Sequence, residues 1–423
     1  MNIAVLFIAL FVLISFSIPV GLCIGGATII VLAWFGGADL QIIAKYCVTG
    51  IDSFPLMAIP FFILAGTIMS TGGLARRMVD IAAALLARIT GGLGAVVAVA
   101  SMFFGALSGS SLATVSAIGS IMVPEMKRKG YGVGYSAAFT ACAGTVGAVI
   151  PPSIPLVIYG CVTGTSVGDL FIAGIAPGIL IGIGLIVGNY ITCKRKGYVG
   201  AEEFVEKSFW KTLWEGKWAL IAPFIILGGI YAGIFTPTEA AVVAVVYSII
   251  VSVFIYKELD LKGLYTTFKD SVVINGITTY LLGISTGFAA YLSFAQVPRQ
   301  LAEVLTTLTD NKMIFLLIIN LALLIIGCVV DNIPATIILS PMLLPAMQAF
   351  GVSPVHFGVF MTINLLIGLV TPPYGCSLFV ASAICKVSME DIMKNIATPL
   401  IILIVCLMLI TYIPQITMFL IPE

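Results

Sequence analysis

Apolar residues occur in long blocks along the chain, and short polar or glycine-rich segments separate these blocks. Most blocks are about 20 residues long, the length of a helix that crosses the hydrocarbon core of a membrane. Two blocks, 92–126 and 313–347, are too long for one span and too short for two spans with a turn. Each is interrupted in its middle, by "GALSGSS" and by "VVDNIP". We therefore predict two re-entrant helical hairpins, whose turns are enclosed by protein rather than lipid.

The block that follows each hairpin is also interrupted. Residues 141–160 read "ACAGTVGAVIPPSIPLVIYG", and residues 364–382 read "NLLIGLVTPPYGCSLFVAS". A Pro-Pro pair removes two backbone donors and clashes with the preceding turn, so a helix breaks there. The sequence thus predicts two broken membrane helices, 133–164 and 355–386, with free N–H and C=O groups at each break.

These four elements belong to an internal repeat. The segment "GALSGSSLAT" (105–114) aligns with "GCVVDNIPAT" (327–336) at a spacing of 222 residues. The segment "GAVIPPS" (147–153) aligns with "GLVTPPY" (368–374) at a spacing of 221 residues. We therefore predict two copies of one unit, joined by a polar, amphipathic connector at 194–217.

Basic residues indicate the topology. Seventeen of the twenty Lys and Arg residues lie in the segments 74–90, 127–132, 194–217, 257–270 and 386–394. Because cytoplasmic loops are enriched in basic residues, we place these segments in the cytoplasm and expect both termini in the periplasm. The first hairpin tip then opens to the cytoplasm and the second to the opposite side. The two copies are thus predicted to be inverted, as in many secondary transporters.

Composition agrees with a membrane protein. The chain is 60% hydrophobic and 9% charged, whereas a soluble domain has about 25% charged residues. A net charge of +1 gives no indication of a nucleic-acid partner. The sequence has no HExxH, GxGD or Walker A motif, and the one histidine, His356, has no convincing nucleophile beside it. We therefore expect a transporter rather than an enzyme.

The interrupted helices predict ion sites. Carbonyl, hydroxyl and amide oxygens around a small cavity suit Na⁺, because a hard cation prefers oxygen ligands. The first predicted site combines Ser108, Ser110, Ser111 and Thr114 of the tip with Gly144, Thr145, Gly147 and Pro151 of the break. The second combines Asn332 and Thr336 with Gly368, Thr371 and Pro372. Symmetry suggests two ions, and the sequence does not fix their number.

Asp331 is the only charged residue of the second hairpin block between Met313 and Met347. An intramembrane carboxylate suggests a function. Three roles remain open for it: a ligand of an ion, a cap on a half-helix, or a structural hydrogen-bonding group. Taken alone, Ser, Gly and Thr residues at a tip indicate close packing, and a Pro-Pro pair indicates a kink. The occurrence of the same tip and break in both copies favours a binding site.

The chain resembles the large membrane subunit of the tripartite ATP-independent periplasmic (TRAP) transporters over essentially its whole length. The resemblance rests on "SGSSLATVSAIGSIMVPEMKRKGY", "GTVGAVIPPSIPLVIYG", "FTPTEAAVVAV", "DNIPATIILSPMLLP" and "GLVTPPYGCSLFV", in this order. It implies an all-α, elevator-type fold of the ion transporter superfamily in the bacterial inner membrane. It also implies Na⁺-driven import of an organic acid, such as a C4-dicarboxylate, a sialic acid or another sugar acid.

The resemblance further implies two partners, a small four-helix membrane subunit and a periplasmic substrate-binding protein that delivers the acid. In the implied mechanism the loaded transport domain slides inward against a scaffold within the lipid bilayer. The corresponding parts are scaffold helices 1–52, arm and transport half 53–193, connector 194–217, scaffold helices 218–270, and arm and transport half 271–423. The candidate substrate residues are Ser110, Ser153, Asp331, Asn332, Tyr374 and Ser377.

Two rival functions remain open. The first is a Na⁺/carboxylate symporter that works alone, without a binding protein. The second is a membrane enzyme or a subunit of a structural assembly, for which the sequence offers no nucleophile–base pair.

Overall fold

The fold comes from a computed structural model, which describes residues 2–16, 18–36, 39–198, 208–373 and 375–421. Every regular element among these residues is a helix, which confirms the all-α prediction. The first copy contains α1 (Asn2–Ser15), α2 (Val20–Phe35), α3 (Leu40–Thr49), η1 (Phe54–Met57), α4 (Ala58–Thr71), α5 (Leu74–Leu86), α6 (Gly92–Ser108), α7 (Ser111–Arg128), α8 (Val133–Val146), α9 (Ile154–Thr163) and α10 (Val167–Lys196). The second contains α11 (Phe209–Tyr231), α12 (Pro237–Ile249), η3 (Ile250–Ile255), α13 (Leu261–Phe294), α14 (Val297–Leu308), α15 (Lys312–Gly327), α16 (Asn332–Ala349), α17 (Pro354–Gly368), α18 (Cys376–Cys385), α19 (Met389–Tyr412) and α20 (Gln415–Met418).

Helix lengths follow the interruptions in the sequence. Among the described residues, six helices are long and apolar enough to cross a membrane. Shorter apolar helices of 10–17 residues make up much of the remainder, including α6, α9, α15, α17 and α18. These shorter helices border the two tips and the two Pro-Pro segments, because glycine and proline residues end a helix there.

The same order of helices occurs twice. A pair of helices joined by a short tip, α6 with α7 and α15 with α16, precedes a pair separated by the Pro-Pro segment, α8 with α9 and α17 with α18. One long helix, α10 or α19, then follows in each copy. An amphipathic helix, α5 or α14, precedes each hairpin.

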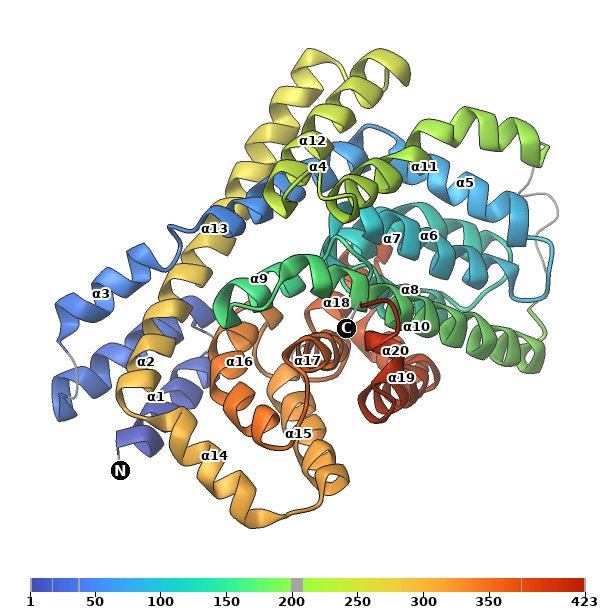
Figure 1. The fold of residues 1–423 in the computed structure, drawn as a ribbon. Helices are drawn as coiled ribbons and strands as arrows, with labels where there is room; N and C mark the ends of the chain where they lie inside the picture. The colour runs from blue at the N-terminus through green and yellow to red at the C-terminus, as the bar shows by residue number, and fades with distance from the viewer. Residues whose placement is uncertain (1, 17, 37–38, 199–207, 374, 422–423) are drawn as a thin grey trace.

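The two copies interlock at the centre of the molecule. Helix α7 of the first hairpin packs against α18, and α16 of the second hairpin packs against α9. The long helix α13 runs diagonally along one side, with α2 and α3 beside one part of it and α4 beside another (Figure 1). Helix α13 also contacts α16, so this long helix lies directly against the second hairpin.

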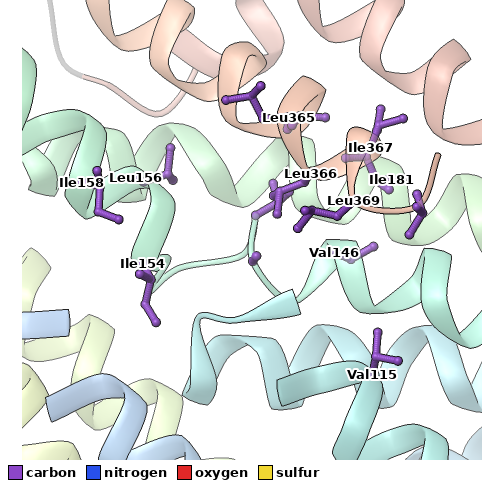
Figure 2. Packing of buried hydrophobic residues seen from close by; sticks show 14 of the residues in the cluster. Val115, Val146, Ile154, Leu156, Ile158, Ile181, Leu365, Leu366, Ile367 and Leu369 are labelled. Carbon is purple, nitrogen blue, oxygen red and sulfur yellow. The ribbon is translucent and has the colours of Figure 1, made fainter. Parts of the chain in front are cut away.

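The hydrophobic core includes the breaks in the two interrupted helices. Leu366 and Leu369, at the end of α17, lie next to the segment that joins Val146 of α8 to Ile154 of α9 (Figure 2). All four side chains are buried. The irregular backbone at the break is therefore enclosed by side chains of the other copy, as irregular backbone at membrane depth requires.

Several of the predicted part boundaries fall inside helices. The division at residue 270 lies within α13, which continues without a break from Leu261 to Phe294. The connector 194–217 starts within α10 and ends within α11, and its residues 199–207 lie outside the described part of the chain. These predicted boundaries therefore do not mark helix ends, because the change from polar to apolar residues occurs within a continuous helix.

Candidate functional site

The tip of the first hairpin is bound to the first break through the backbone. Helix α6 ends at Ser108, and Ser110 caps α7 by accepting a hydrogen bond from the Ala113 N–H at 3.4 Å. Between them, the carbonyl of Gly109 accepts a hydrogen bond from the Ile154 N–H at 3.2 Å. Ile154 is the first residue of α9, so this bond ties the tip to the second half of the broken helix.

Two glycines bring the backbones of tip and break into contact. A Cβ atom added to Gly105 would lie 2.1 Å from the Cα atom of Gly147, so neither position has room for a side chain. Thr114 packs against the same glycine, and its Oγ1 lies 3.3 Å from Ser108 Oγ and 2.8 Å from the Ser110 carbonyl. Three oxygen atoms of the predicted first ion site thus lie together beside the break.

The second tip repeats the glycine contact. A Cβ atom added to Gly368 would lie 2.3 Å from the carbonyl carbon of Gly327. Asp331 is the N-cap of α16, and its Oδ1 accepts a hydrogen bond from the Asn332 N–H at 2.7 Å. Asp331 thus makes a capping hydrogen bond, which corresponds to one of the three roles left open for it. Asn332 Oδ1 in turn accepts from Thr336 Oγ1 at 3.3 Å.

A cavity of about 540 Å³ lies between the two tips. Ser108, Ser110 and Ser111 line it from the first tip, and Asp331 and Asn332 from the second. Among the described residues that line it, Asp331 is the only charged one and none is basic. Asn332 is buried, and its Nδ2 has no hydrogen-bond partner within the described chain. The cavity is therefore lined by hydroxyl groups and helix N-termini, and the unpaired Asn332 amide lies buried in its wall.

Part of the cavity wall was not predicted from the sequence. Helix α4 contributes Ile63, Gly66, Thr67 and Ser70, and helix α13 contributes Ile274, Ile277, Thr278 and Leu281. Gly66 allows a close approach, because a Cβ atom there would lie 3.0 Å from Ser108 Cβ. The sequence offered only a weak signal for this wall, namely polar residues such as Thr67, Ser70 and Thr278 within apolar stretches of these helices.

The other predicted site residues lie outside the cavity lining. Thr114, Gly147 and Gly368 form the contacts between tip and break described above, while Pro151 packs toward Gly174 of α10. Thr145 donates to the Cys142 carbonyl within α8, and Thr371, just after α17, donates to the Ile367 carbonyl. Ser153 caps α9 and also donates to the Ala148 carbonyl. Tyr374 lies outside the described residues.

The donor atoms present suit an alkali cation. Within the described part of the chain, no group of three or more His, Cys, Asp or Glu side chains is placed to hold a metal ion. The tip-to-break contacts instead offer neutral hydroxyl and carbonyl oxygens, such as Ser108 Oγ, Thr114 Oγ1 and the Ser110 carbonyl. Hard, weakly polarising cations prefer such ligands, whereas zinc, iron and copper prefer imidazole or thiolate.

Comparison with known proteins identifies the family. A family model described as "Tripartite ATP-independent periplasmic transporter, DctM component" matches residues 7–416. The chain belongs to this family. It is therefore a TRAP large permease, a multi-pass membrane protein of a family of transporters, and this assignment confirms the resemblance seen in the sequence.

Relatives of this TRAP permease differ in their named substrates. It is 42% identical over 98% of its length to the isethionate TRAP transporter permease protein DctMQ of Oleidesulfovibrio alaskensis, and it spans 65% of that longer protein. It is 36% identical over 96% of its length to the sialic acid TRAP transporter large permease protein SiaM of Vibrio cholerae, of which it covers 95%. Its fold is similar to the YdaH transporter of Alcanivorax borkumensis, with a TM-score of 0.63, 14% identity and 88% of each chain covered.

Proposed function

We propose that this TRAP permease imports an organic anion together with Na⁺, and that both bind at the two hairpin tips. The cavity between the tips is the observation that supports this proposal. It contains polar groups of both copies, and it is also bordered by α4 and α13. Sites at the junction of two repeats, built from helix ends, are typical of secondary transporters.

Na⁺ occupies the oxygen clusters behind the tips. At the first, Ser108 and Thr114 provide hydroxyl groups, and the break that includes Gly147 provides backbone carbonyls. At the second, Asn332 and Thr336 provide the side-chain oxygens, and Gly368 of the break packs against Gly327. A bound cation draws each tip and break together and lowers the cost of placing an anion beside Asp331. Ion binding thus prepares the cavity for the substrate.

The substrate anion is held without a basic side chain. Asn332 Nδ2 is buried and free to donate, and the hydroxyl group of Ser110 borders the same cavity. The N-termini of α7 and α16 carry partial positive charge and face an anion favourably. The apolar side chains of Ile274 and Ile277 cover the rest of the bound molecule.

The transport cycle we propose is of the elevator type. The hairpins, the broken helices, α10 and α19 form the transport domain, and α5 and α14 are arms that link it to a scaffold. The remaining helices, with the small membrane subunit, form this scaffold in the bacterial inner membrane. A periplasmic binding protein delivers the anion. The permease is oriented in the membrane with both of its termini in the periplasm. The names of relatives suggest isethionate, sialic acids and C4-dicarboxylates as the first compounds to test.

Reconstitution tests the proposal. Proteoliposomes containing the permease, its small membrane subunit and the binding protein are loaded without Na⁺ and given a panel of organic acids. We expect uptake only with an inward Na⁺ gradient and only when the binding protein is present. Uptake that persists in K⁺ alone would contradict coupling to Na⁺. Uptake without the binding protein would instead support the symporter that works alone.

A further inference from the structure

The elbow between α4 and α5 is built without side chains. Gly72 and Gly73 join the two helices, and Gly73 has a φ of +83°, which favours glycine. A Cβ atom added to Gly72 would lie 2.0 Å from Ser252 Oγ, and one added to Gly73 would lie 1.9 Å from Glu258 Oε2. The elbow therefore lies directly against η3 and the segment that follows it.

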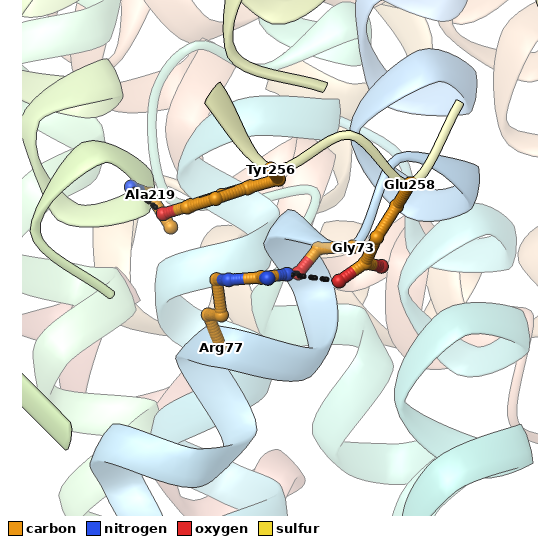
Figure 3. Close-up of polar contacts among 5 residues, drawn as sticks. All are labelled: Gly73, Arg77, Ala219, Tyr256 and Glu258. Atoms are coloured by element: carbon orange, nitrogen blue, oxygen red, sulfur yellow. Dashed lines mark hydrogen bonds and ion pairs between the residues drawn. The ribbon is translucent and has the colours of Figure 1, made fainter. Parts of the chain in front are cut away.

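Arg77, one turn into α5, binds the same segment. Its Nη1 donates to Glu258 Oε1 at 2.6 Å and to the Gly73 carbonyl at 2.9 Å, and its guanidinium lies 3.6 Å from the centre of the Tyr256 ring (Figure 3). The Tyr256 hydroxyl accepts a hydrogen bond from the Ala219 N–H at 3.2 Å. Arg77 thus connects the start of α5 with the end of η3 and, through Tyr256, with α11.

The backbone of η3 and of the residues that follow it, up to Glu258, has an unusual conformation that allows this contact. Helix α12 continues into η3, a short π-helical turn, and such turns are rare and often occur at functional sites. After it, Lys257 adopts a φ of +56°. The Glu258 N–H then donates to the Ser252 carbonyl at 3.1 Å. This turn places the carboxylate of Glu258 opposite Arg77.

The corresponding arginine of the second copy is arranged differently. Arg299 aligns with Arg77 at a spacing of 222 residues and lies on α14, the second amphipathic helix. Its side chain is 77% exposed, whereas that of Arg77 is 22% exposed, and it pairs with Glu303 of its own helix at 3.1 Å. The ion pair of Arg299 therefore stays within α14, while the ion pair of Arg77 joins separate elements.

We propose that Arg77, Tyr256 and Glu258 form a latch that fixes the start of α5 to α11 and η3 during transport. Because its start is fixed, the arm α5 moves mainly at its far end, where it joins α6. An exposed ion pair contributes little to stability. Here Glu258 is exposed, but Arg77 is partly buried, its guanidinium is stacked on an aromatic ring, and the pair lies beside an elbow that has no room for a side chain; these features strengthen it. The effect on transport rests on the proposed function; the anchoring itself does not.

Hydrogen–deuterium exchange of the purified full chain in nanodiscs tests the anchoring. We expect Arg77→Gln and Glu258→Gln each to accelerate exchange of the amides in 70–80 by about tenfold, because local opening becomes easier. The double variant should show no further increase, since both changes remove the same interaction. Arg299→Gln, the matched change in the other copy, should leave exchange in 70–80 unchanged.

Two results would overturn the latch. One is unchanged exchange in 70–80 in both Arg77→Gln and Glu258→Gln, in protein whose helix content by circular dichroism equals that of the wild type. The other is an equal acceleration by Arg299→Gln, which would mean that the effect is general. The exchange measurement needs neither Na⁺ nor substrate, so a failure of the proposed transport activity in the wild type would be seen separately, in the uptake assay.

Discussion

The hydroxyl oxygens of Ser111 and Ser377 lie 3.1 Å apart, although the two residues are 266 positions apart in the chain. Ser111 begins α7 at the first hairpin tip, and Ser377 lies at the start of α18, just after the second Pro-Pro segment. Both are buried. The contact therefore joins the tip of one copy to the broken helix of the other.

This contact predicts an energetic coupling between the copies. We expect Ser111→Ala and Ser377→Ala each to lower the free energy of unfolding by about 1 kcal/mol, since each leaves the other buried hydroxyl without this partner. The double variant should cost less than the sum of the two, and thermal or denaturant unfolding of the purified protein would measure it. Strictly additive losses would mean that the two hydroxyls do not interact.

The glycine contact between tip and break predicts that a larger residue at this contact strongly destabilises the protein. Gly105→Ala would place a methyl group 2.1 Å from the Gly147 backbone. We expect a loss of about 3 kcal/mol, because backbone atoms cannot move aside as a side chain can. Gly228→Ala is the matched control, since nothing lies within 4 Å of its added Cβ. Equal melting temperatures for both variants would contradict the close packing of tip and break.

The buried position of Asn189 predicts that its substitution lowers the free energy of unfolding. It is buried in α10, where its Nδ2 donates to the Gly91 carbonyl at 2.7 Å and its Oδ1 accepts from the Tyr135 hydroxyl at 3.0 Å. We expect Asn189→Ala to cost about 2–4 kcal/mol, because the Gly91 carbonyl, the Tyr135 hydroxyl and the Cys193 thiol, which also donates to Oδ1, each lose a partner. Tyr135→Phe, which removes only one of these bonds, should cost less. A larger loss in Tyr135→Phe, measured by the same unfolding assay, would contradict this ranking.

For Asn332 we predict a loss of transport that is larger than its modest loss of stability accounts for. Its Nδ2 has no partner in the described chain, but its Oδ1 accepts a hydrogen bond from the buried Thr336 Oγ1, so we expect the Asn332→Ala variant to lose about 1 kcal/mol of stability. We expect Asn332→Ala to reduce the initial rate of Na⁺-driven uptake at least about tenfold, through loss of a hydrogen bond to a charged ligand. Asn311→Ala, at the exposed start of α15, serves as the control. Wild-type uptake by Asn332→Ala would remove this residue from the site.

Local signals in the sequence identified the interrupted helices. Glycine and proline act on the residues beside them, so "GALSGSS", "VVDNIP" and the two Pro-Pro pairs located the ends of α6, α15, α8 and α17 within a few residues. In the "FTPTEAA" segment, Thr236 and Glu239 form a capping box at the beginning of α12, which is also a local signal.

Contacts between distant segments were not accessible in the same way. The α4 and α13 wall of the cavity and the Arg77–Glu258 pair join residues that no periodicity or spacing relates. The continuity of α13 across residue 270 was also missed, because its polar first turns and apolar remainder read as two elements. The composition of a stretch of helix indicates whether water or lipid surrounds it. A change of composition does not show that the helix ends there.

The stabilisation of the purified permease by Na⁺ tests the central claim most directly. A cation that binds only the folded protein stabilises it by about 2–3 kcal/mol at a hundredfold excess over its Kd. We predict a rise in melting temperature of about 2 °C or more when Na⁺ replaces K⁺, and its loss in the Thr114→Ala/Thr336→Ala variant. Equal melting temperatures in Na⁺ and K⁺ for the wild type, or an undiminished Na⁺ effect in the double variant, would contradict Na⁺ binding at the hairpin tips.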